Sequence, residues 1–236
     1  YKMQLASHGM GAAAALALSG IDLALWDIKC QATGLPLVQL LGGSAKPVKA
    51  YAGGIALGWQ DPASLAEEAM RYVAQGYRAL KLRMGDTPVR DIARVRAVRK
   101  AVGDGIDILT DANTAYTLDD VRRVMPAFEE CAVGWLEEPF PPQDRRAYAI
   151  AATLGRVPLA AGENHYTRYE FATLLEDGHV QFVQPDLSKT GGKELKITYT
   201  RVTILDVFNT EGAGPALKSH GEVRVVSRVV GFKKIN

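Results

Sequence analysis

The feature that most limits how this chain can fold is a unit of one strand and one helix that recurs along it. Apolar stretches of strand length alternate with helix-forming stretches at intervals of roughly 25–30 residues. The predicted strands cover residues 48–54, 79–84, 107–113, 134–139, 158–164 and 182–188. Helices between them begin at Asp61-Pro62, Thr87-Pro88 and Thr117, which are residue types common in helix first turns. This alternation indicates a parallel sheet with crossover helices.

The repeated units favour one fold class, an α/β protein built as a modified TIM-type (β/α) barrel. A doubly wound sheet is the alternative, but the sequence has no glycine-rich loop of the dinucleotide-binding type. We expect the barrel over residues 47–236, with a clear pattern to about residue 193, after a helical segment over residues 1–46. The tail over residues 201–236 matches no part of this pattern. The length of 236 residues allows one large core.

Composition narrows the partners and the location of the protein. The net charge is +2, so neither nucleic acid nor an anionic membrane is expected as a partner. The Ala-rich stretch 11–20 continues into 21–28, which has helical apolar spacing and two aspartates. We therefore predict an amphipathic helix there, and neither a signal peptide nor a membrane span. Cys30 and Cys131 belong to no metal or redox motif and are expected to be reduced thiols of a cytoplasmic protein.

Acidic side chains stand where a barrel wall should be apolar. Asp111, Glu137 and Glu163 lie near the carboxyl ends of predicted strands, on the face expected to point inward, and successive acids are 26 residues apart. The three carboxylates should therefore converge at one barrel mouth. Converging carboxylates need a cation, and an all-oxygen ligand set favours Mg²⁺, or Mn²⁺ in its place, over zinc. Two alternatives stay open. The acids could simply face solvent or cap helices, and Glu138 could be the metal ligand in place of Glu137.

Other polar residues share the inward faces. Lys81 and Arg83 alternate with leucines on the second predicted strand, and Gln184 aligns with Asp186 on the sixth. A guanidinium stays protonated at any ordinary pH, so Arg83 is a poor general base and is better suited to holding a carboxylate.

Several short motifs follow one another along the chain. They are Ile21–Lys29 (IDLALWDIK), Gly34–Gly43 (GLPLVQLLGG), Lys81-Leu-Arg83, Asp111-Ala-Asn113, Trp135-Leu-Glu-Glu-Pro139, Ala161-Gly-Glu-Asn164 and Gln184–Gly192 (QPDLSKTGG). Each motif is modest alone, but in this order they are specific. The chain over residues 12–193 resembles the enolase superfamily, in the group of mandelate racemase and muconate lactonizing enzyme.

The resemblance implies a metal site and a proton-transfer mechanism. It implies Mg²⁺ held by Asp111, Glu137 and Glu163, where the ion binds the substrate carboxylate and stabilises the enediolate formed when the α-proton leaves. In many relatives the aspartate that matches Asp186 orients a histidine from the seventh strand, and His220 is our candidate for that histidine.

The resemblance also assigns residues that contact the substrate and shows a departure from the family. Asn113 and Lys189 match positions that line the site in relatives, and His165 at the barrel mouth is expected to contact the substrate. The strand-two motif of the family is usually Lys-x-Lys, with the second lysine as the base, and here that position is Arg83. Lys81 remains on the same side of the substrate. A racemase needs competent acid/base groups on both faces of its substrate, so this departure argues against a mandelate-type racemase.

The hypothesis that follows is a lyase that dehydrates a hydroxylated sugar acid. Its alternatives are a racemase, epimerase or cycloisomerase of another carboxylate, and a non-catalytic ligand-binding relative. We expect the N-terminal α+β capping domain of such enzymes to be missing before Tyr1, and the last barrel units to be incomplete after Gly192. We expect a small carboxylate as substrate and a homo-oligomer as the assembly.

Overall fold

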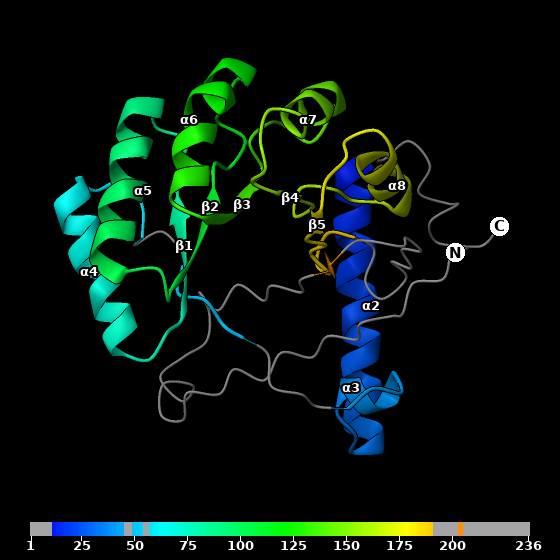
Figure 1. Cartoon of the computed structure of the whole chain (residues 1–236). Coiled ribbons are helices and arrows are strands. Elements are labelled where there is room, and N and C mark those ends of the chain that lie inside the picture. The colour runs from blue at the N-terminus through cyan, green and yellow to red at the C-terminus, as the bar shows by residue number, and fades with distance from the viewer. Residues whose placement is uncertain (1–10, 45–48, 54–56, 191–202, 205–236) are drawn as a thin grey trace. The chain divides into compact units, whose positions relative to one another are not determined.

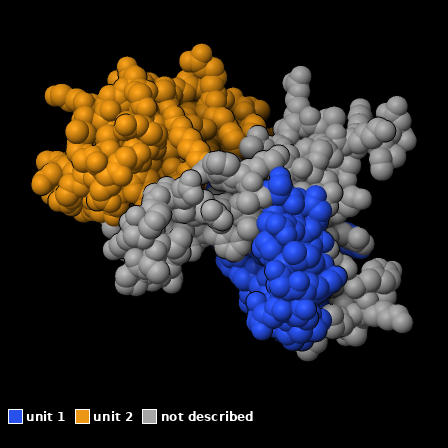
Figure 2. Space-filling model, turned by 90° about the horizontal axis from the view of Figure 1, so that it is seen from below, with its two compact units in different colours: residues 1–48, 162–174, 183–236 blue, residues 49–161, 175–182 orange. Residues whose placement is uncertain are grey.

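The computed structural model describes residues 11–44, 49–53, 57–190 and 203–204. The chain divides into two compact units (Figure 2), and each is described by itself. The first unit comprises Tyr1–Val48, Gly162–Leu174 and Val183–Asn236, and the second comprises Lys49–Ala161 and Leu175–Phe182.

The second unit is built on parallel strands that alternate with helices (Figure 1). Its strands are β1 (Ala79–Arg83), β2 (Asp107–Asp111), β3 (Val133–Glu137) and β4 (Leu159–Ala161), and β5 (Phe182–Val183) begins in this unit. Its helices are α4 (Pro62–Ala74), α5 (Pro88–Val102), α6 (Leu118–Glu130) and α7 (Arg145–Ala151). Strands β1 to β4 pair in chain order, each parallel to the next. This is the wall of a partial TIM-type barrel, which confirms the predicted fold class.

The helices of this wall begin where the sequence indicated. The Asp61 carboxylate accepts from the backbone N–H groups of Ala63 and Ser64 at 3.1 Å each, with Pro62 in the first turn of α4. Thr117 forms a reciprocal capping box with the third residue of α6, Asp120. These caps satisfy amide groups that a helix cannot pair within itself, so the start of each helix is fixed locally.

The apolar core lies between the strands and the helices of the second unit. Leu80, Leu82, Ile108 and Leu136 are fully buried, because alternate strand residues face the helix layer. Helix α4 packs against α5, α5 against α6, and α6 against α7, in chain order. On the opposite face of β1, Lys81 and Arg83 are only partly buried, whereas Ala79 at the start of the strand is buried.

Three predicted strands are much shorter than the sequence indicated, and the other three end one or two residues early. The first, 48–54, is a single bridge from Ala52 to Leu80 within its described residues, next to Gly53, which has no side chain to pack. The fifth ends at Ala161 because Gly162 follows with φ +148°, outside strand geometry. The sixth ends at Val183, two residues before Pro185, which cannot donate a ladder hydrogen bond.

The first unit contains the long helix α2 (Gly11–Thr33), the short helix α3 (Leu37–Leu40) and the two-residue strand β6 (Thr203–Ile204); helix α8 (Arg168–Glu176) begins in this unit. The predicted helix over 11–28 is present, but its amphipathic pattern is weak, because apolar residues from Leu16 to Ile28 are spread around the helix. By length and hydropathy alone α2 is also apolar enough to cross a membrane, a criterion that core helices of soluble proteins and signal sequences meet as well.

Candidate metal and catalytic site

Two acids meet at the carboxyl ends of neighbouring strands in the second unit. The sheet register places Arg83 beside Asp111, and Asp111 beside Glu137. A register shift between Ile108 and Thr110 brings the last two into line. The side chains of Asp111 and Glu137 are 5% and 2% exposed, so two carboxylates are withdrawn from water side by side.

A lysine from β1 bridges the two acids. Lys81 Nζ lies 3.0 Å from Asp111 Oδ2 and 2.9 Å from Glu137 Oε1, and it also lies 5.8 Å from the centre of the Tyr51 ring. Burial alone would lower the pKa of the Lys81 ammonium, but the carboxylates of Glu137 and Asp111 outweigh burial and raise that pKa. The structure therefore brings together three residues singled out from the sequence, with one cation against two anions.

The remaining oxygens of both acids are held by nearby donors. Trp135 Nε1 donates to Glu137 Oε2 at 3.0 Å, and the backbone N–H of Asn113 donates to Asp111 Oδ1 at 2.9 Å. The Trp135 ring packs edge-on against Tyr51, with 6.2 Å between ring centres, and lies 5.3 Å from the Phe182 ring. Strand alternation placed Trp135 on the inward face, but the hydrogen bond of its indole to a neighbouring acid was missed.

Left-handed backbone follows both acid-bearing strands. Asn113, Thr114 and Glu138 have φ values of 44°, 64° and 38°. Such a conformation costs about 1–2 kcal/mol for a residue with a side chain. At Glu138 this conformation ends the alternation of side chains between the two faces of the strand. The buried Glu138 side chain therefore does not continue the face pattern to which Glu137 belongs. The register therefore favours Glu137 over Glu138 as the acid beside Asp111.

Arg83 brings a second cation to the end of β1. Its Nε is buried and has no hydrogen-bond partner among the residues that the structure describes. Its backbone N–H donates to Leu57 O at 2.8 Å, which fixes the end of β1. A buried guanidinium donor without a partner is suited to binding an anion such as a carboxylate.

The donor set fits a hard divalent cation, because two buried carboxylates carry more charge than Lys81 neutralises. Across the described part of the chain, no three His, Cys, Asp or Glu side chains gather closely enough to hold a metal ion. The acids of this site form a pair, and Glu163 belongs to the first unit. A common site for Asp111, Glu137 and Glu163 therefore stays a prediction.

The other predicted site residues lie in the first unit. Lys189 Nζ donates to Asn164 Oδ1 at 3.3 Å, next to Glu163. His165 is 3% exposed, and its ring centre lies 5.5 Å from that of Phe171. This segment is pressed close to the sixth predicted strand, since a Cβ at Gly162 would lie 2.8 Å from backbone atoms of Gln184.

The predicted proton-transfer dyad is described only at its aspartate. Asp186 Oδ1 accepts from the backbone N–H of Ser188 at 2.8 Å and from its hydroxyl at 2.7 Å. Its predicted partner, His220, lies outside the described residues. The pairing of Asp186 with a histidine therefore stays a prediction.

The fold and the site together define a class of protein, a (β/α)-barrel protein with acids and a lysine at the carboxyl ends of its strands. Residues 64–196 match the family model of the enolase C-terminal domain-like proteins. Residues 2–42 match that of the mandelate racemase / muconate lactonizing enzyme N-terminal domain. The chain belongs to the enolase superfamily, in the mandelate racemase and muconate lactonizing enzyme group.

Several curated relatives are dehydratases or cycloisomerases of sugar acids or their derivatives by name, and one is a hydrophobic dipeptide epimerase of Enterococcus faecalis. The chain is 35% identical over 215 residues to a 3,6-anhydro-alpha-L-galactonate cycloisomerase of Streptomyces coelicolor, covering 90% of this chain and 57% of that protein. It is 35% identical to an arabinonate dehydratase of Saccharolobus solfataricus, covering 81% of this chain and 52% of that one. The chain thus spans about half the length of the curated relatives it matches.

Solved structures show the same likeness. An enolase-superfamily member from a Polaromonas species is 61% identical, with a TM-score of 0.78, covering 81% of this chain and 51% of that one. A racemase from Streptomyces coelicolor with bound magnesium is 35% identical, with a TM-score of 0.75, covering 81% of this chain and 58% of that one.

Proposed function

We propose that this protein is a Mg²⁺-dependent lyase that removes the proton α to a carboxylate and dehydrates a hydroxylated sugar acid. The observation that carries the proposal is the buried cluster of Lys81, Asp111 and Glu137 at the carboxyl ends of adjacent strands. Dehydratases of sugar acids among the relatives, and a magnesium-bound structural neighbour, support it. Mn²⁺ in place of Mg²⁺ is part of the proposal.

Asp111 and Glu137 would hold the metal, with Glu163 as the third ligand. Bound there, Mg²⁺ supplies a Lewis acid for the substrate carboxylate and stabilises the charge that develops as the α-proton leaves. Trp135 and the backbone of Asn113 fix the orientation of the two acids before any ligand arrives. This preorganisation lowers the cost of assembling the site.

Lys81 and Arg83 would divide the work on one side of the substrate. The buried Arg83 Nε offers a fixed donor to the substrate carboxylate, because a guanidinium does not give up its proton. Lys81 Nζ lies beside the acids and would carry or return a proton on that side. Asp186 with His220 would take the α-proton on the other side and help to expel the β-hydroxyl. Asn113, His165 and Lys189 would line the substrate.

Arg83 favours dehydration over racemisation, because a racemase needs a competent base on each face of its substrate. Cycloisomerisation is the second candidate, since one relative that covers 90% of this chain is a cycloisomerase by name. A non-catalytic binder is the third. The proposal also includes a cytoplasmic location, consistent with Cys30 and Cys131 as free thiols, and a homo-oligomer that light scattering would detect.

The test is a panel of sugar acids incubated with the purified protein and Mg²⁺ in deuterated water. For one acid, NMR should show loss of the α-proton signal and formation of a 2-oxo-3-deoxy acid. Deuterium incorporation without loss of water would favour a racemase, and a rearranged product without loss of water would favour a cycloisomerase. No exchange with any acid would contradict the proposal and favour a binder.

The variant Arg83→Met sharpens this test. We expect it to lose turnover while Mg²⁺ still binds in calorimetry, because the two carboxylates do not depend on Arg83 for their orientation. Unchanged turnover in Arg83→Met would assign Arg83 to structure. The exposed Arg96 of α5 gives a matched control, Arg96→Met, whose turnover and Mg²⁺ binding should equal those of the wild type.

A further inference from the structure

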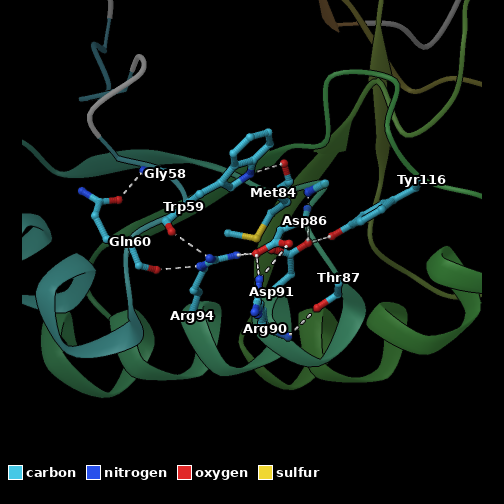
Figure 3. A network of polar contacts seen from close by, with 11 residues as sticks. Gly58, Trp59, Gln60, Met84, Asp86, Thr87, Arg90, Asp91, Arg94 and Tyr116 are labelled. Carbon is cyan, nitrogen blue, oxygen red and sulfur yellow. Dashed lines mark hydrogen bonds and ion pairs between the residues drawn. The ribbon is translucent and has the colours of Figure 1, made fainter.

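A second buried charge cluster lies at the start of α5 (Figure 3). Asp91 is fully buried, and its carboxylate accepts four hydrogen bonds. Two come from the backbone N–H groups of Gly85 and Asp86, at 3.0 and 3.1 Å. The third comes from the Tyr116 hydroxyl at 2.7 Å, and the fourth from Arg94 Nη1 at 3.0 Å. All its donors lie outside the first turn of α5, in the loops after β1 and β2 or one turn further along the helix.

Asp91 is not the cap of its own helix. Thr87 has that place, with its hydroxyl accepting from the backbone N–H of Arg90. The Asp91 carboxylate instead reaches back to the loop that connects β1 to α5. It therefore satisfies amide groups of that loop, which would otherwise need another acceptor.

Arg94 extends the cluster to a third loop. Its Nε donates to Gln60 O and its Nη2 to Trp59 O, both at 2.8 Å. Its Nη1 also lies 3.0 Å from Asp86 Oδ2. The Trp59 indole in turn donates to Met84 O at 3.0 Å, so the loop before α4 and the loop after β1 are held to each other (Figure 3).

Two of the loops held by this cluster follow β1 and β2, the strands that carry Lys81, Arg83 and Asp111. Met84 N donates to Asp111 O at 2.7 Å, directly linking the end of β1 to the acid of β2. Gly85 has φ +88°, and a Cβ there would lie 2.6 Å from Ala112 O, so the two loops touch without room for a side chain. Tyr116 N donates to Pro139 O at 3.0 Å, which continues the link to the loop after β3.

The donors of the cluster keep their protons over a wide range of pH. Burial and the neighbouring Asp91 carboxylate raise the pKa of the Tyr116 hydroxyl, so it stays a donor. Arg94 is a permanent cation. A buried ion pair is weak evidence for stability, because desolvation offsets its attraction. The contacts of this ion pair with three loops indicate a role in holding those loops in place.

We infer that Asp91 and Arg94 are positioning residues, which hold the loops after β1 and β2 so that Arg83 and Asp111 face metal and substrate. The inference rests on the proposed function for what those two residues do. It makes a claim of its own, that loop order at 84–86 and 112–116 depends on the Asp91 carboxylate. Asp91 and Arg94 act only through the loops they hold, and neither is proposed to contact the reacting atoms.

The test compares Asp91→Asn with the wild type by three measurements. The amide keeps the shape of the side chain but turns one acceptor into a donor, which must face either the loop N–H groups or the Arg94 guanidinium. Hydrogen–deuterium exchange should become about tenfold faster or more at residues 84–86 and 112–116 while β1 to β3 stay protected. The Mg²⁺ dissociation constant should rise about tenfold, and kcat should fall more than KM changes.

Two further variants keep the test decisive. Tyr116→Phe removes one hydrogen bond only and should show the same pattern with a smaller amplitude, even if Asp91→Asn fails to fold. Arg94→Lys keeps the charge and should recover part of the Mg²⁺ affinity that Arg94→Met loses. Arg96→Met on the exposed face of α5 should leave all three readouts unchanged.

The opposing outcomes separate this inference from the proposed function. Folded variants with wild-type loop exchange and wild-type Mg²⁺ affinity would overturn it, and so would faster exchange spread equally over loops and strands. A wild-type protein that binds no Mg²⁺ and exchanges no substrate proton would refute the proposed function. Loop exchange alone would then decide whether Asp91 orders these loops.

Discussion

The two ends of β2 carry the same pair of residue types in different surroundings. At its amino end, Asp107 pairs with Lys49, and both side chains are 59% exposed. At its carboxyl end, Asp111 pairs with Lys81, and these side chains are 5% and 16% exposed. An exposed pair contributes about 0–1 kcal/mol, whereas a buried one must compensate a large desolvation cost. The comparison shows that burial, and not residue type, distinguishes a site from a surface ion pair.

Helix α5 repeats this contrast with two arginines. Near the amino ends of the strands, Arg99 donates to the backbone carbonyls of Cys131, Gly103 and Ile106, at 2.6–2.8 Å. Arg94 lies on the same helix, near the carboxyl ends of the strands. It also binds backbone carbonyls, but in addition it pairs with two acids, the partly buried Asp86 and the buried Asp91. The arginine near the amino ends of the strands therefore binds only neutral acceptors among these contacts, whereas the arginine near their carboxyl ends also pairs with charged groups.

The largest expected effect separates the two aspartates of β2. Asp111→Asn should weaken Mg²⁺ binding on the order of a hundredfold or more and abolish turnover, because the proposed metal site loses one of its carboxylates. The matched variant Asp107→Asn should bind Mg²⁺ as the wild type does and change stability by about 1 kcal/mol or less. Calorimetry with Mg²⁺ and chemical unfolding measure both. Equal Mg²⁺ affinity in the two variants would remove the distinction between the strand ends.

The next effect concerns the two lysines. Without metal, Lys81→Met should lower the free energy of unfolding by about 3–5 kcal/mol, since it leaves two buried carboxylates without their cation. Mg²⁺ should then raise the Tm of this variant more than that of the wild type, because the ion replaces the missing charge. Lys49→Met should lose about 1 kcal/mol or less and show the wild-type response to Mg²⁺. A Mg²⁺-induced Tm shift in Lys81→Met no larger than that of the wild type would count against a metal at these acids.

A smaller effect is expected at Trp135. Trp135→Phe keeps an aromatic ring between Tyr51 and Phe182 but removes the donor to Glu137 Oε2, and should weaken Mg²⁺ binding about 10–100-fold. Tryptophan fluorescence gives a second readout, since Mg²⁺ should change the wild-type emission and not that of this variant. Trp26→Phe on α2 is the control. A Mg²⁺-dependent emission change that survives in Trp135→Phe would place the responding indole elsewhere.

The smallest effect belongs to an exposed acid with partners of its own. The Ser64 hydroxyl, followed by the Ser64 backbone N–H, lowers the pKa of Asp61 below its ordinary value of 3.8. A lowered carboxyl pKa stabilises the fold above that ordinary value, and the contribution disappears as pH falls through the lowered one. Asp61→Asn should therefore lower Tm slightly at pH 7, and the difference should shrink as pH falls below 3.8. Thermal scans across pH check this, and a difference independent of pH would contradict it.

The strand period was enough to predict much of the wall and part of the site. Alternation placed Lys81, Asp111 and Glu137 on inward faces at strand ends, and the structure brings these three together. Residue types at helix starts predicted where α4, α5 and α6 begin. These features depend on neighbours within a few positions, which a sequence displays directly.

What the sequence did not indicate depends on contacts between distant segments. Asp91 stands at a sequence position typical of a first-turn acid of a helix, and its donors Gly85 and Tyr116 are recognisable only once the loops are folded. The indole bond of Trp135 to Glu137 needs a specific side-chain rotamer, which strand alternation does not specify. The weak amphipathic pattern of α2 differs from the prediction, because a few apolar positions at helical spacing do not represent the whole helix.

The left-handed backbone after β2 allows loop motion to be changed separately from stability. At Thr114, φ is 64°, so Thr114→Gly would relieve strain of about 1 kcal/mol. Glycine also gives the unfolded chain about 0.4–1 kcal/mol more conformational freedom, which cancels most of that gain. The melting temperature would then stay nearly constant while the loop beside Asp111 gains mobility. For protein engineering, this position offers a way to vary the mobility of one loop while the strands and helices around it keep their stability.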